Sequence, residues 1–62
     1  MTDLEKLRAL SRALLASLRW SYDDTADFVR GKSLDDPTYD PHFKADVKEM
    51  RVGLAIAEEV LR

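Results

Sequence analysis

The sequence predicts an all-α fold, either an antiparallel helical hairpin or a small three-helix bundle, assembled into a dimeric helical bundle. Three observations predict it. Apolar residues recur at helical spacing in the first and the last third of the chain. Each of these segments follows a helix-capping signal. Apolar and polar residues nowhere alternate convincingly between turn signals, as they would in a strand.

The last third of the chain carries the clearest helical pattern. Its apolar residues are spaced four, three, four, three and four positions apart: Phe43, Val47, Met50, Leu54, Ala57 and Leu61. This spacing is typical of a helix that packs along a neighbouring helix. Asp40 can cap such a helix, and Pro41 fits its first turn, where no backbone donor is needed. We therefore expect a helix over about residues 41–61, with its seam as the principal packed surface.

The first third predicts a helix over about residues 3–20. Thr2 and Glu5 form a capping box, in which each side chain bonds the other's backbone amide. The expected seam consists of leucines, with Ser11 at the missing heptad position and two further leucines flanking it: Leu4, Leu7, Leu14 and Leu18, with Leu10 and Leu15. Another face carries Ala9, Ala13 and Ala16 and leads to Trp20. Such a face could admit a closely packed helix; the interpretation we favour is that alanine simply fills helix surface.

Between these segments we expect a short helix over about residues 22–30, capped by Ser21 and ended by Gly31. A continuous helix from the first segment to Arg30 is the alternative. The following stretch, residues 32–39, is predicted to be a loop because aspartate–proline pairs mark its turns. Leu34 and Tyr39 are its expected anchors in the core.

Size and composition limit what the chain can do. It has 62 residues, no cysteine, one histidine and a formal net charge of −2. One small domain is the most that this length supports, and its stability is marginal without oligomerisation or very regular packing. Thiolate and histidine-rich metal sites are excluded. No apolar run reaches the roughly 18 residues of a membrane span, and the start lacks the apolar core of a signal peptide. We expect a cytoplasmic protein without a membrane role.

No pattern indicates catalysis. The acidic segment 34–42 gathers oxygen ligands near His42, but Asp40 is explained as a helix cap, and the spacing of a calcium loop is absent. Asp23 and Asp27 share a helix face, more often a solvated acidic surface than a metal site. His42 in a first helical turn is expected at the surface. We therefore expect no enzyme activity, no metal and no cofactor.

Three arginines, Arg8, Arg12 and Arg19, lie within about 40° of one another on the first helix. Arg8 and Arg12 are like charges four positions apart, an arrangement that destabilises a helix slightly unless something compensates it. Candidate compensating groups within the chain are the carboxylates of Glu5, Asp46, Glu49 and Glu58. An acidic protein partner or nucleic acid phosphates are the alternative, which makes these arginines candidate partner-binding residues.

The leading functional hypothesis is a small non-enzymatic interaction module, a regulator or an assembly subunit, that self-associates and binds another, unidentified protein. Its self-association face is predicted on the third helix, about 180–220° from Phe43, at Ala45, Val52 and Ile56. Alternatively, Val52 and Ile56 pack on the middle helix within one chain. The functional alternative is a dimeric nucleic-acid-binding regulator that uses the arginine stripe of Arg8, Arg12 and Arg19.

Overall fold

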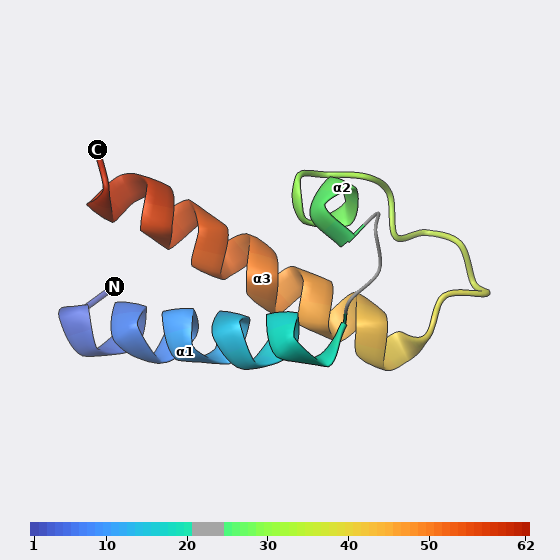
Figure 1. The fold of residues 1–62 in the computed structure, drawn as a ribbon, viewed down its shortest axis with the longest axis horizontal. Helices are drawn as coiled ribbons and strands as arrows, with labels where there is room; N and C mark the ends of the chain where they lie inside the picture. The colour runs from blue at the N-terminus through green and yellow to red at the C-terminus, as the bar shows by residue number, and fades with distance from the viewer. Residues whose placement is uncertain (21–24) are drawn as a thin grey trace.

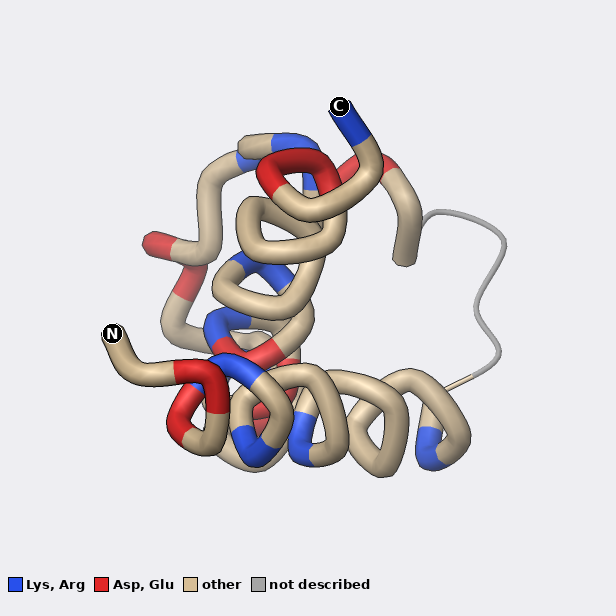
Figure 2. The backbone as a smooth tube through the Cα atoms, turned by 90° about the vertical axis from the view of Figure 1, so that its left-hand side faces the viewer, with Lys and Arg blue, Asp and Glu red and all other residues tan. Residues whose placement is uncertain are grey.

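The computed structural model describes residues 1–20 and 25–62, and within these ranges the chain forms three helices and no strand. Helix α1 spans Asp3–Arg19, α2 spans Thr25–Val29 and α3 spans Pro41–Val60. The two long helices form an antiparallel hairpin, so that both chain ends lie at the same end of the molecule (Figure 1). They cross obliquely rather than running parallel to each other (Figures 1 and 2). The all-α prediction is confirmed.

The ends of the long helices follow the predicted capping chemistry. The Thr2 amide donates to Glu5 Oε1 at 3.1 Å, and the Glu5 amide donates to the Thr2 hydroxyl at 3.2 Å. This reciprocal pair is a complete capping box. The His42 amide donates to Asp40 Oδ1 at 2.8 Å, with Pro41 in the first turn of α3. Both helices therefore begin where local sequence signals place them.

Helix α1 ends at Arg19, because Trp20 adopts an extended conformation with φ −125° and ψ 125°. A continuous helix from the first segment to Arg30 is thereby excluded. Ser21 and Tyr22, the expected cap and first residue of the short helix, lie outside the described residues, as does Asp23. Beyond α2, Gly31 has a φ of +127°, in the region that favours glycine, and so terminates the helix as expected.

The core lies where α2 and the loop 32–39 cover the N-terminal half of α3. Its buried residues form one cluster: Ala16, Phe28, Phe43, Val47 and Met50. Phe43 meets Trp20 and Phe28 edge to face, with ring centroids 5.1 and 5.2 Å apart. Such contacts add about 0.5–1.5 kcal/mol per pair beyond area burial. Leu34 and Tyr39 pack against this cluster, which confirms both as the anchors of the loop.

The packing face of α1 differs from the expected one. Ala9 and Ala16 are buried, whereas the predicted leucine seam faces away from α3. The reason is a close approach between the helices: a methyl group added at Gly53 would overlap the side chain of Ala13. Alanine against glycine brings the helix axes nearer than leucine would allow. The small-residue interpretation of the alanine face is correct, and the interpretation as surface filler is wrong.

The expected seam of α3 is buried only in its first half. Phe43, Val47 and Met50 are buried, but Leu54 is 38% exposed and Leu61 is 84% exposed. Helix α2 packs on α3, and its Phe28 belongs to the same buried cluster as Ala16 of α1. Figure 1 shows α2 beside the first half of α3, with no second helix at the same side of its C-terminal end. None of the described helices has the length and apolar character needed to cross a membrane.

Candidate protein-interaction surface

A row of exposed leucines runs along the outside of α1. We call it the leucine face and define it by five residues that are 56–75% exposed: Leu4, Leu7, Leu14, Leu15 and Leu18. At about 100° per residue they occupy an arc of about 100° on the helix. The middle of this arc lies opposite the buried Ala9 and Ala16. Exposed apolar side chains gathered on one face of a helix are typical of an interaction site.

Two serines on α1 have their hydroxyl groups satisfied within the helix. The Ser11 hydroxyl donates to the Leu7 carbonyl at 2.9 Å, and the Ser17 hydroxyl donates to the Leu14 carbonyl at 2.7 Å. Ser11 stands in the middle of the leucine face, and Ser17 lies about 60° outside its edge. Because these donors already have partners, covering them would leave no donor unpaired. The leucine face can therefore be buried without a polar penalty at Ser11.

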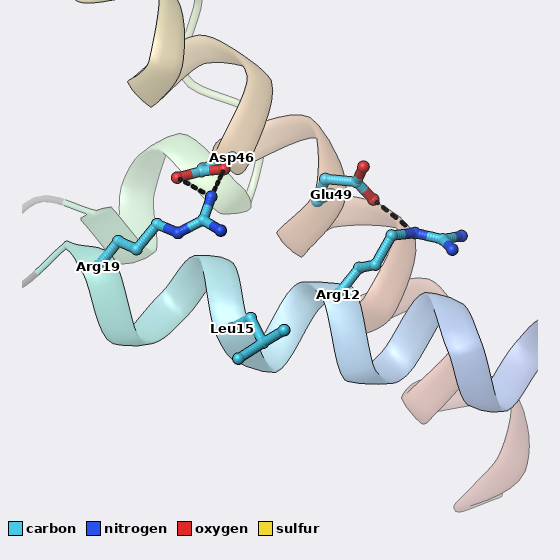
Figure 3. A pocket seen from close by; sticks show the side chains of 5 residues that line it. All are labelled: Arg12, Leu15, Arg19, Asp46 and Glu49. Atoms are coloured by element: carbon cyan, nitrogen blue, oxygen red, sulfur yellow. Dashed lines mark hydrogen bonds and ion pairs between the residues drawn. The ribbon is translucent and has the colours of Figure 1, made fainter.

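The arginine stripe borders one edge of the leucine face and is largely paired within the chain. Arg12 Nε lies 3.5 Å from Glu49 Oε2, and Arg19 Nη1 lies 3.1 Å from Asp46 Oδ1 (Figure 3). These four side chains, with Leu15, line a hollow of about 160 Å³. Arg8 makes no ion pair with any other residue that the structure describes. Two of the three arginines are therefore compensated by the acidic flank of α3, as the first of the two interpretations expects.

Asp46 is a buried polar residue of the hairpin, with 7% of its surface exposed. In addition to Arg19, it accepts a hydrogen bond of 2.6 Å from Trp20 Nε1. A buried carboxylate is tolerated only when it is paired and hydrogen-bonded, and both partners come from the C-terminal end of α1. Asp46 therefore fixes the end of α1 against α3.

Arg51 holds α2 against α3, as Asp46 holds the end of α1. The sequence pattern gave no indication of this role. Its Nε and Nη2 atoms donate to the Phe28 carbonyl at 2.9 and 2.6 Å, and Nη2 also donates to the Lys32 carbonyl at 2.8 Å. Carbonyls at a helix C-terminus lack partners within the helix. The Phe28 carbonyl also accepts from the Gly31 amide at 3.2 Å, and Lys32 lies in the loop beyond α2. The guanidinium group of Arg51 completes the bonding of these carbonyls and holds α2 on α3.

The predicted self-association residues do not all share one exposed face. Ala45 and Val52 are exposed and line a shallow hollow of about 370 Å³ with Lys48 and Glu49. Ile56 requires a correction, because it is only 5% exposed and lies inside the hairpin. It follows Gly53 by three positions and so shares the side of α3 that packs on α1. A surface that depends on an accessible Ile56 is therefore wrong, while Ala45 and Val52 stay available.

Charges around the hairpin are mixed. Figure 2 shows both basic and acidic positions along α1 and along α3. Lys6 and Glu59 add a further ion pair of 3.2 Å near the chain ends. Within residues 1–20 and 25–62, no three histidine or acidic side chains gather in an arrangement that could hold a metal ion. His42 is exposed, and Asp40, its sequence neighbour, serves as the cap of α3.

The sequence pattern did not identify the leucine face as an exposed surface, because the spacing of its leucines equals that of a packed seam. The sequence did contain a signal for the alternative packing, since three alanines in one helix and one glycine in the other can form a close crossing. Comparison of the chain with protein-family models, curated proteins and solved structures finds no match.

Proposed function

We propose that this chain is a small non-enzymatic interaction module that self-associates and binds another protein, as a regulator or an assembly subunit. The observation that carries the proposal is the leucine face, where five leucines of one helix remain more than half exposed. A cytoplasmic location is part of the proposal, and the absence of cysteine is compatible with it. The proposal assigns the chain no cofactor.

The free energy available at this surface is of the size that protein association requires. Full burial of a leucine is worth about 1.5–3 kcal/mol, so covering five leucines that are about 60% exposed contributes about 5–9 kcal/mol. An equal surface on the partner doubles this gain. Association costs about 4–15 kcal/mol in lost freedom of motion. The balance favours a reversible complex formed through the leucine face.

The nucleic-acid alternative has weaker support. It requires basic side chains that are available to phosphates, but Arg12 and Arg19 lie in ion pairs with α3. Arg8 alone of the stripe has no ion-pair partner among the described residues. A salt titration of DNA and RNA binding tests this alternative, because phosphate contacts weaken steeply as the salt concentration rises.

Site-specific photo-crosslinking in cells tests the proposed function. A photoreactive amino acid replaces Leu15 on the leucine face and, as the matched control, Ala55 on the exposed side of α3. We expect adducts from position 15 with a second copy of the chain and with one other protein, and neither adduct from position 55. Equal adduct patterns from the two positions, or none from position 15, would overturn the proposal.

A further inference from the structure

We propose that the leucine face is the interface of a homodimer in which two α1 helices cross antiparallel, with Ser11 of each copy at the two-fold axis. This inference rests on the proposed function and adds to it the surface and the geometry of self-association. It also replaces the predicted face on α3, from which the burial of Ile56 removes one of three residues.

Four of the five leucines are spaced symmetrically about Ser11; Leu14 is the exception, because its symmetric position is occupied by Arg8. Leu4 and Leu18 each lie seven positions from Ser11, and Leu7 and Leu15 each lie four positions from it. A two-fold axis through Ser11 therefore places Leu4 opposite Leu18 of the second copy, and Leu7 opposite its Leu15. A two-fold interface requires this property, because the same patch must complement itself.

Ser11 suits the crossing point for two reasons. Its side chain is small, so two helices can approach closely there, as α1 and α3 do at Ala13 and Gly53. Its hydroxyl already donates to the Leu7 carbonyl, so an apolar environment leaves no donor unpaired. A leucine at position 11 would continue the apolar row but would hold the two helices apart.

The charges beside the leucine face favour a second copy over an acidic partner. An antiparallel crossing brings the arginine stripes of the two copies together, which would be repulsive if all three arginines were unpaired. Glu49 and Asp46 neutralise Arg12 and Arg19 within each copy, and Arg8 remains. Little net positive charge is then left to attract an acidic helix or phosphate groups. The dimer should strengthen moderately with salt, because salt screens the repulsion between the two Arg8 side chains.

The size of the surface indicates a dissociable dimer. From Leu4 to Leu18 the face is about 21 Å long, and a helix is about 10 Å wide. A single helix pair of this length buries a few hundred Å² per copy, less than the roughly 800 Å² of a standard interface. We therefore expect a dissociation constant in the micromolar range. The monomer should fold without its partner.

Disulfide trapping tests the crossing point, since the natural chain contains no cysteine. Ser11→Cys should form a covalent dimer in oxidised glutathione at least tenfold faster than Ser17→Cys. Ser17 is the matched control, because it is equally a serine of α1 but lies six positions from the axis. Equal rates for the two variants would overturn the crossing at Ser11. Rapid trapping of Leu4→Cys with itself would indicate parallel helices and would also overturn the inference.

Sedimentation equilibrium tests the surface independently. Leu7→Glu should weaken the dimer at least tenfold, whereas Val52→Glu on α3 should leave it unchanged, with helicity by circular dichroism verifying both folds. A dimer that Val52→Glu disrupts and Leu7→Glu does not would overturn this inference while self-association itself stands. A monomer throughout the micromolar range would overturn both self-association and this inference. A monomer that instead binds a different protein, nucleic acid or anionic vesicles through α1 would overturn them as well.

Discussion

Gly53 of α3 lies so close to Ala13 of α1 that a methyl group on the glycine would overlap the alanine side chain. This contact lies within the interface between the long helices, on the side of α1 opposite the leucine face. Small residues on both helices allow the backbones to approach, and the alanine face becomes the packed face. The exposure of the leucines is the direct consequence of this contact.

Gly53→Ala should destabilise the protein although alanine is the better helix former. Overpacking typically costs about 1–3 kcal/mol, and the gain in helix propensity is about 1 kcal/mol. Urea unfolding gives the free energy of unfolding. Adding Ala13→Gly should relieve the overlap, so that the two changes are coupled by at least about 0.5 kcal/mol in a double-mutant cycle. A Gly53→Ala variant more stable than the natural chain would contradict the close crossing.

Ile56→Ala and Leu54→Ala form a matched pair, because both remove the same number of carbon atoms two positions apart. Ile56 is 5% exposed and Leu54 is 38% exposed. We expect Ile56→Ala to cost about 2–5 kcal/mol and Leu54→Ala to cost less than half as much. Thermal unfolding at a concentration where the chain is monomeric provides the comparison. Equal losses would mean that the faces of α3 are assigned wrongly.

Arg51→Lys should release α2 from α3. Lysine retains the charge but cannot reproduce the fork of guanidinium donors that meets the Phe28 and Lys32 carbonyls. Hydrogen bonds to charged groups contribute about 1.5–3 kcal/mol, so amide hydrogen exchange in α2 should accelerate at least about tenfold. Exchange in α1 should change little. Arg30→Lys, at an exposed position after α2, is the control and should have no effect.

The capping box of α1 should weaken in acid. The Thr2 amide and, to a smaller extent, the Thr2 hydroxyl lower the pKa of Glu5 below its ordinary value of 4.5. Because the folded-state pKa is the lower one, the stabilisation is complete above pH 4.5 and is lost as the pH falls through the folded-state pKa. Nuclear magnetic resonance titration of the Thr2 amide should follow this transition.

Glu5→Gln is the control for this titration. Glutamine preserves a capping acceptor but has no proton to gain in acid. The Thr2 amide signal should therefore stay constant with pH in this variant. A Thr2 amide that titrates identically in both proteins would show that Glu5 does not cap the helix.

The sequence determined the local structure of this protein. Helix starts at Thr2 and Asp40 and the stop at Gly31 depend on hydrogen bonds and backbone angles among residues a few positions apart. The anchoring roles of Leu34 and Tyr39 were likewise evident, since they are the large apolar side chains of an otherwise polar loop. Such interactions require no knowledge of the rest of the chain, and the structure reproduces them.

Only the tertiary structure decided which side of α1 is packed. The leucine and alanine faces share the same helical period, and hydrophobicity alone favours burying the leucines. The opposite outcome depends on Gly53, forty positions after Ala13, because close contact between two helices requires small residues on both at the same point. The burial of Asp46 and the role of Arg51 depend in the same way on backbone groups that come near only after the hairpin closes. The leucines of α1 are therefore exposed because Gly53, distant in the sequence, lets α3 pack closely against the alanines on the other side of α1.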